Sequence, residues 1–240
     1  MNFIKINVLF LVLFLFCISC NKEENQIIVV PETPITVAKD TLNYLALGDS
    51  YTIGQSILEI DRFPVQLTKM LQKESILIKL PKIIAKTGWR TDNLSAAMDA
   101  AKLENNWDMV TLLIGVNNQY QGQNVVGYEQ PFRELLQRAI TLAKGKKERV
   151  FVVSIPDYAY TPFGKNSGNQ QQISSEIDSY NAVNQKVTKE LDVAYFNITP
   201  ISREGLQDPD LVASDGLHPS GKMYTRWVEL MLGEVKKVLK

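Results

Sequence analysis

Residues 44–54 read YLALGDSYTIG, a short apolar run that stops at a glycine and passes into a turn containing a serine. An apolar run of this length, bounded by turn residues, predicts a buried strand at Tyr44–Leu47. The turn Gly48-Asp49-Ser50 then lies where a strand gives way to a helix. A serine at such a turn can present its hydroxyl above the edge of a sheet.

Outward from this stretch, apolar runs alternate with segments of helical periodicity to the end of the chain. Strand-like runs occupy residues 76–80 with 83–85, 109–114, 150–155 and 193–198, and helical spacing marks residues 63–71, 94–101, 132–142, 170–191 and 220–239. Thr91 or Asp92 is a suitable cap for the second of these helices. We therefore predict one α/β domain at residues 41–240, with three α/β/α layers and a five-stranded parallel sheet.

In such a sheet the ligand binds outside the carboxyl ends of the strands. The residues that follow the predicted strands are accordingly the candidates for chemistry. They are Gly48–Ser50, Gly88, Gly115–Asn118, Pro156-Asp157 and the loop before the last helix.

The loop before the last helix holds Asp215 and His218, in the run Ser-Asp-Gly-Leu-His-Pro. His218 is the single histidine of the chain, so a general acid–base role near neutral pH falls to it. The Asp-x-x-His spacing allows the carboxylate to fold back onto one ring nitrogen while the other faces outward. Elsewhere, the amide of Asn117 is a candidate oxyanion donor, and Gly88 offers a backbone N–H where a side chain would obstruct.

Composition excludes several classes of protein. Lys+Arg and Asp+Glu both number 26, so the net charge is zero and no nucleic-acid partner is indicated. Two cysteines and one histidine make a poor zinc site, so we expect no metal. The pattern Gly-x-Ser-x-Gly is absent because position 52 is threonine, which disfavours an ordinary α/β-hydrolase.

Taken together, these motifs resemble the SGNH (GDSL-type) hydrolases over residues 44–230, with details similar to a bacterial subgroup of lysophospholipase-like esterases. The resemblance implies a flavodoxin-like fold, no cofactor, and a Ser50–His218–Asp215 triad. It also implies an oxyanion hole formed by Ser50, Gly88 and Asn117. The family usually has aspartate after the oxyanion asparagine, whereas this chain has Asn118. That departure places the local hydrogen bonding in question rather than the chemistry.

The first 20 residues, MNFIKINVLFLVLFLFCISC, have a short positive end and an apolar run too short to span a bilayer. They predict a signal peptide at residues 1–19, and Cys17-Ile-Ser-Cys20 resembles a bacterial lipobox. Cys20 would then carry lipid, residues 20–40 would be a tether, and the protein would be anchored to a membrane of the cell envelope. The alternatives are a plain signal peptide and an uncleaved anchor.

These residues predict an esterase for short acyl or acetyl groups, on a small molecule or a carbohydrate, with a monomer favoured. An acyltransferase onto sugar hydroxyls would use the same triad, and a surface-tethered binding protein would not use it at all. We also expect aromatic and apolar residues near strand ends to line the cleft or simply to pack: Tyr51, Ile53, Trp89, Tyr120, Tyr158 and Tyr160. Arg90 either binds a carboxylate or pairs with Asp92.

Overall fold

The computed structural model describes residues 41–240, and the predicted signal segment, Cys20 and the tether lie outside them. Five strands form one sheet in the order β2-β1-β3-β4-β5, and every neighbouring pair is parallel. The strands are β1 (Tyr44–Gly48), β2 (Lys82–Ala85), β3 (Met109–Leu113), β4 (Val150–Val153) and β5 (Ala194–Phe196). This is the doubly wound, flavodoxin-like order, so the predicted fold class is confirmed.

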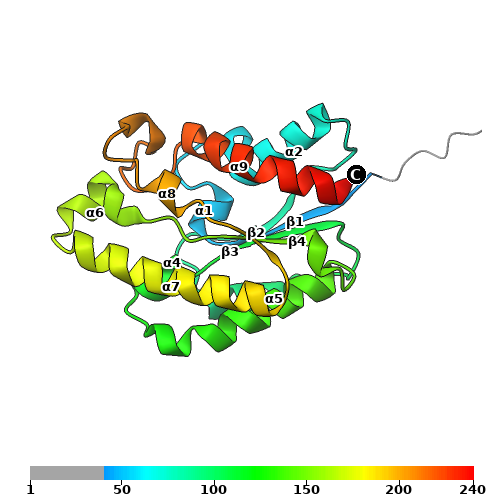
Figure 1. Cartoon of the computed structure of the whole chain (residues 1–240), viewed down its shortest axis with the longest axis horizontal. Helices are drawn as coiled ribbons and strands as arrows, with labels where there is room; N and C mark the ends of the chain where they lie inside the picture. Colours follow the sequence, from blue (N-terminus) through cyan, green and yellow to red (C-terminus); the bar gives the residue numbers. More distant parts are fainter. Residues whose placement is uncertain (1–40) are drawn as a thin grey trace, which may run out of the picture. The chain divides into compact units, whose positions relative to one another are not determined.

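Helices cover both faces of the sheet (Figure 1). On one face α2 (Phe63–Lys73) packs against α9 (Gly221–Leu239). On the other face α5 (Glu129–Leu142) packs against both α3 (Thr91–Ala100) and α7 (Gln170–Glu190). The short helices are α1 (Ser50–Ile53), α4 (Val116–Tyr120), α6 (Pro162–Asn166) and α8 (Thr199–Ser202), with 3-10 turns at Glu59–Asp61, Val125–Gly127, Lys147–Arg149, Tyr158–Tyr160 and Pro209–Leu211.

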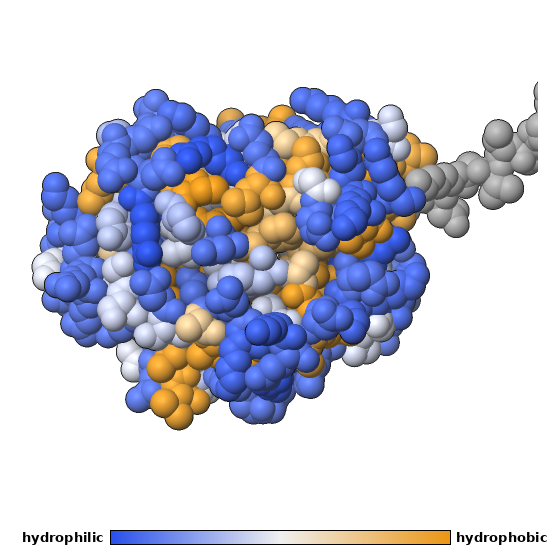
Figure 2. Space-filling model, in the orientation of Figure 1, coloured by the Kyte–Doolittle hydropathy of each residue, from blue (hydrophilic) through white to orange (hydrophobic). Residues whose placement is uncertain are grey.

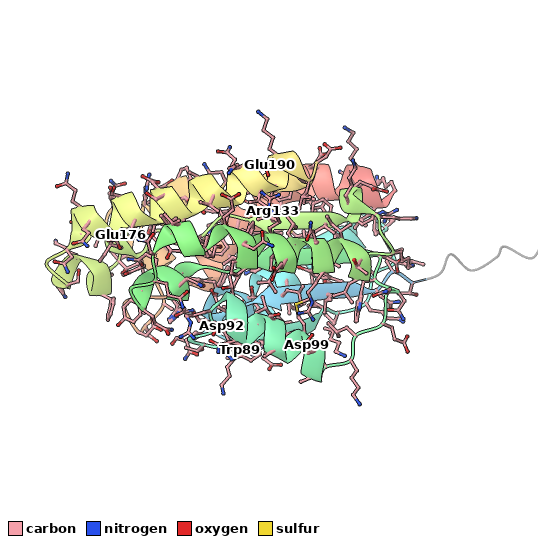
Figure 3. The ribbon with its side chains drawn as sticks, turned by 90° about the horizontal axis from the view of Figure 1, so that it is seen from below. Trp89, Asp92, Asp99, Arg133, Glu176 and Glu190 are labelled. Atoms are coloured by element: carbon pink, nitrogen blue, oxygen red, sulfur yellow. The ribbon has the colours of Figure 1, made fainter. Side chains whose placement is uncertain are left out.

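The core follows from this layering. All residues of β1, β3 and β4 are buried, as their largely apolar runs predict for strands covered on both faces. Ion pairs at the surface connect helices α5 and α7. Arg133 of α5 pairs with Glu129 at 3.0 Å and with Glu190 of α7, and Figure 3 shows Arg133 and Glu190 on neighbouring helices.

The face of the domain that Figure 2 shows is mostly polar. In Figure 2 hydrophilic residues cover most of the face in view, and hydrophobic residues form separate patches among them. No helix within residues 41–240 has the length and apolar character needed to cross a membrane.

Two local predictions are wrong. Residues 76–80 do not form a strand, and Ile78 makes only a single bridge to Leu42. The strand begins after Pro81, since proline has no N–H to donate to a ladder. The cap of α3 is Arg90 rather than Thr91 or Asp92, and the Asn93 side chain accepts a 3.1 Å hydrogen bond from the Arg90 N–H.

The sheet reverses its winding between β1 and β3, which creates a crevice at their carboxyl ends. The register pairs Gly48 with Ala85 of β2 on one side and with Leu113 of β3 on the other. A Cβ at Gly48 would collide with the Thr52 side chain and the Leu113 carbonyl, so only glycine lets α1 start this close to β3. The loops after these three strands therefore meet at one edge of the sheet.

Candidate active site

One cavity at this edge, with a volume of about 260 Å³, collects most of the residues singled out in the sequence. Ser50 comes from the start of α1, Gly88 from the turn after β2, Asn117 from α4, and His218 from the loop before α9. Asp215 does not line the cavity and lies behind His218 instead. Residues far apart in the chain thus surround a single space large enough for a small substrate.

Ser50 is the first residue of α1 and is nearly fully buried, with 4% of its surface exposed. Asp49 caps this helix, because its Oδ1 accepts a 3.0 Å hydrogen bond from the Tyr51 N–H. Gly54, in the left-handed region at φ 69°, ends the helix after one turn. The local sequence therefore places the serine at the N-terminus of a very short helix, where it lines the cavity.

Asp215 and His218 form a close pair. His218 Nδ1 lies 2.6 Å from Asp215 Oδ2, and Asp215 Oδ1 accepts the N–H groups of Leu217 and His218, each at 2.9 Å. Burial opposes ionisation of Asp215, but these bonds and one from Ser56 outweigh it and hold the pKa of the carboxyl at about 2. The carboxylate is therefore ionised at neutral pH and holds the ring with the Nδ1 proton toward it.

The His218 ring also packs against Tyr51, with ring centroids 5.5 Å apart. Among the described residues no hydrogen bond joins His218 to Ser50, although both line the same cavity. Such contacts are often long without substrate and tighten when it binds.

Gly88 and Asn117 are held to each other through the turn after β2. Asn117 Nδ2 donates one hydrogen to the Trp89 carbonyl at 3.0 Å, and Gln121 Nε2 donates to the Gly88 carbonyl at 3.1 Å. Gly88 has a φ of 85°, a left-handed conformation that glycine adopts without strain. An amide carries two hydrogens, so Asn117 retains a second N–H for another acceptor.

Asn118, which departs from the family pattern, has a supporting role in the structure. Its side chain is buried, and its Nδ2 donates to Thr91 Oγ1 at 2.9 Å and to Gln123 Oε1 at 2.7 Å. Its Oδ1 accepts from the Thr91 N–H at 3.2 Å. The asparagine therefore joins α4 to the start of α3 with its hydrogen-bonding groups satisfied. An ionised aspartate there would have no N–H to donate to Gln123 Oε1.

The rest of the cavity wall is largely apolar and aromatic. Tyr120, Tyr158 and Phe163 contact one another, with ring centroids 6.0–6.3 Å apart. Of the six residues predicted to line the cleft or pack, Tyr51, Tyr120 and Tyr158 line it, and Ile53, Trp89 and Tyr160 do not. Val116 and Leu217, which belong to the predicted strand-end segments, also line the cavity, as does Thr87 next to Gly88. Phe163 lines it as well but lies outside every predicted segment.

Tyr160 packs beside the Arg203 guanidinium, 5.8 Å from the centre of its ring. Arg90 pairs with Asp92 at 2.7 Å and donates to Gln121, so the pairing alternative holds in this structure. Within residues 41–240, no cluster of three or more His, Cys, Asp or Glu side chains is placed to hold a metal ion.

Asp49 has an unusual environment for a carboxyl group. Its side chain is fully buried, and its Oδ2 has no hydrogen-bond partner within the described residues. Burial raises the pKa of Asp49 to about 7, despite the opposing hydrogen bond from Tyr51. Because the folded pKa lies above the unfolded value, this group favours folding most at low pH and loses that contribution as the pH rises through about 7.

We therefore expect Asp49→Asn to stabilise the protein relative to wild type increasingly between pH 4 and pH 7.5. A shift of about three units corresponds to roughly 4 kcal/mol at most, since one unit is about 1.4 kcal/mol. Urea unfolding of both proteins at several pH values measures the difference. A difference that stays constant with pH would contradict the assignment of this buried group.

Comparison with known proteins supports the same fold. The chain superposes on TesA with a TM-score of 0.64 and 18% identity, over 82% of this chain and 99% of that one. Axe2, an acetylxylan esterase from Geobacillus stearothermophilus, gives 0.63 and 20%, over 81% and 94%. The esterase EstA from Pseudoalteromonas sp. gives 0.61 and 16%, over 81% and 97%. No curated protein sequence matches the chain significantly.

At these identities the likeness shows the fold, and the family assignment comes from the sequence itself. Residues 46–226 match the GDSL-like Lipase/Acylhydrolase family. The matched range runs from within β1 into α9, and so contains the Gly-Asp-Ser turn, the strand-end loops and the Asp-x-x-His loop. The chain belongs to the GDSL-like lipase/acylhydrolase family and is a carboxylic ester hydrolase.

Proposed function

We propose that this enzyme cleaves short-chain acyl or acetyl esters through a covalent acyl-enzyme formed on Ser50. The observation that carries the proposal is the Asp215–His218 pair at 2.6 Å, with His218 and Ser50 lining one cavity. Ser50 Oγ attacks the carbonyl carbon while its proton passes to His218 Nε2. The same proton then moves to the departing alcohol oxygen as the C–O bond breaks.

Deacylation repeats these steps with water. His218 takes a proton from water as the oxygen attacks the acyl carbon, and returns it to Ser50 Oγ as the acid leaves. Asp215 keeps the Nδ1 proton in place and stabilises the imidazolium in both steps. The developing oxyanion is bound by the N–H groups of Ser50 and Gly88 and by the free N–H of Asn117.

Removal of the Asn117 amide tests the oxyanion hole. We expect Asn117→Ala to lower kcat by about 10²–10³ with a small change in KM, because the lost hydrogen bond forms fully only in the transition state. Steady-state hydrolysis of a p-nitrophenyl ester measures both constants. Asn106→Ala, which removes an exposed amide outside the cavity, is the matched control. Equal kcat values for the two variants would exclude Asn117 from the oxyanion hole.

The aromatic wall of the cavity favours an ester substrate whose alcohol part has an apolar face. Phe163 donates its N–H to the Gly216 carbonyl at 2.9 Å, so this wall adjoins the loop of His218. His218 is the residue that gives its proton to the departing alcohol. Tyr120 and Phe163 are 58% and 40% exposed, so their rings are accessible. A sugar ring offers such a C–H face, and one structural neighbour is an acetylxylan esterase.

Hydrolysis of p-nitrophenyl acetate, butyrate and octanoate, with Ser50→Ala as control, tests the enzyme and its acyl preference. We expect the acetate and butyrate to be cleaved faster than the octanoate. Product analysis with an added acceptor sugar separates hydrolysis from acyl transfer. Failure to hydrolyse any of the three esters, or hydrolysis that survives Ser50→Ala, would contradict the proposal.

We further propose that Cys20 carries a lipid that anchors the enzyme to a membrane of the cell envelope. The support is the lipobox-like sequence after a short apolar run at residues 8–18. Metabolic labelling with a tagged fatty acid tests the proposal. The label is expected on the wild type and lost in Cys20→Ala, and a label that persists in the variant would contradict it.

A further inference from the structure

A serine outside the motifs identified in the sequence touches the candidate triad. Ser56 Oγ donates a 2.6 Å hydrogen bond to Asp215 Oδ2, the same oxygen that faces His218 Nδ1. The two residues are 159 positions apart in the chain. Asp215 therefore has all its acceptor positions in use: two backbone N–H groups on Oδ1, and one ring nitrogen and one hydroxyl on Oδ2.

The backbone at Ser56 is unusual as well. Within residues 41–240, the non-glycine residues with positive φ are Ser56, Ser75, Lys102, Lys144 and Asp192. All except Ser56 come two residues after the last residue of a long helix, where a left-handed residue ordinarily ends the helix. Ser56, with φ 66°, has no such reason for its conformation. Strained residues of this kind tend to occur at functional sites, where the surrounding structure fixes them.

The position of Ser56 in the chain couples two parts of the site. Ser50 opens α1, Gly54 ends it in the left-handed region, and the loop turns again at Ser56 to reach Asp215. The same seven-residue segment thus presents the nucleophile at one end and a donor to the acid at the other. The Ser56 bond is also the largest of the contacts that lower the pKa of Asp215 against its partial burial.

We propose that Ser56 is a positioning residue, which orients the Asp215 carboxylate toward His218 and so keeps the imidazole aligned with Ser50. This inference rests on the proposed function, because it assigns Ser56 a role in the same reaction. Ser56 does not line the cavity, and its contact with the site is through Asp215. It acts by fixing the rotation of the carboxyl group. The backbone N–H groups hold Oδ1 in place, and with His218 as its single partner Oδ2 would still be free to turn.

The test compares Ser56→Gly with Ser75→Gly. Both replacements relieve a left-handed serine of nearly equal φ, 66° and 61°, but Ser75 lies at the end of α2, away from the cavity. We expect both variants to fold at least as stably as the wild type, since glycine adopts this conformation freely. Ser56→Gly should lower kcat on the order of 10-fold with KM within about twofold, whereas Ser75→Gly should change neither.

A second measurement does not depend on activity. His218 is the single histidine, so its imidazole signals in an NMR spectrum are identified by their uniqueness. We expect its Nδ1 proton to exchange with water faster in Ser56→Gly than in the wild type or in Ser75→Gly. A kcat for Ser56→Gly equal to that of Ser75→Gly, or an unchanged exchange rate, would overturn the proposal. Absence of esterase activity in the wild type would refute the proposed function alone, and the exchange rates would still decide the role of Ser56.

Discussion

The Ser50→Ala variant is expected to lose kcat for ester hydrolysis by a factor on the order of 10⁴–10⁶ while it keeps its fold. Without Oγ no acyl-enzyme forms, and only oxyanion binding and positioning of substrate remain. The fold should persist because the cap of α1 comes from the Asp49 side chain, not from Ser50. An equal melting temperature beside this loss of turnover would separate chemistry from stability.

Labelling gives an independent view of the same residue. A fluorophosphonate probe is expected to modify the wild type at Ser50 and to leave Ser50→Ala unlabelled. Ser179→Ala is a suitable control, since its hydroxyl only donates to the Ser175 carbonyl on the exposed side of α7. Wild-type turnover in Ser50→Ala, or a label found on another serine, would show that the nucleophile lies elsewhere.

The second large effect is expected for Asp215→Asn, with a loss of roughly 10⁴ in kcat. The new amide oxygen can still accept the backbone N–H groups of Leu217 and His218, so the loop should keep its shape. The amide nitrogen then takes the place of Oδ2 and presents a hydrogen to His218 Nδ1. The imidazole must accept there, which places its proton on Nε2, and a protonated Nε2 cannot receive the Ser50 proton.

This prediction can be checked at two levels. Steady-state rates measure the loss, and the ¹⁵N shifts of the single imidazole report which nitrogen carries the proton. Ser56 does not prevent the change, because a hydroxyl can turn to accept from the new amide as easily as it donates. Asp210→Asn removes an exposed carboxylate, which lies 3.4 Å from Lys222, and should leave turnover unchanged. An Asp215→Asn enzyme with more than about one tenth of wild-type turnover would argue against a role in holding the tautomer.

The sheet was predictable because its strands are buried on both faces. The run Met109–Leu113 is apolar apart from Thr111, whose hydroxyl bonds to the Tyr44 hydroxyl, so its apolar residues are enough to identify it. The prediction of a strand at residues 76–80 is wrong because two buried isoleucines, Ile76 and Ile78, are also compatible with an irregular segment. Composition reports that such side chains are covered, but not whether the backbone pairs with a neighbour.

The candidate site divides in the same way. Ser50, Gly88, Asn117 and His218 were found as short motifs at strand ends, and parallel strands bring such ends together. The apolar wall of the cavity gave a weaker signal. Phe163 reads as an ordinary apolar residue, and only the packing of α6 against the His218 loop brings it into the cavity.

The sequence by itself determined the class of fold, the family and the order of the motifs along the chain, because strand burial and turn chemistry are local properties. Only the tertiary structure decided which groups from distant parts of the chain lie next to one another. Neither the unpartnered Oδ2 of Asp49 nor the contact of Ser56 with Asp215 can be read from neighbouring letters. Both depend on which residues distant in the sequence are packed around the group, and the packing of the sheet and its helices fixes that.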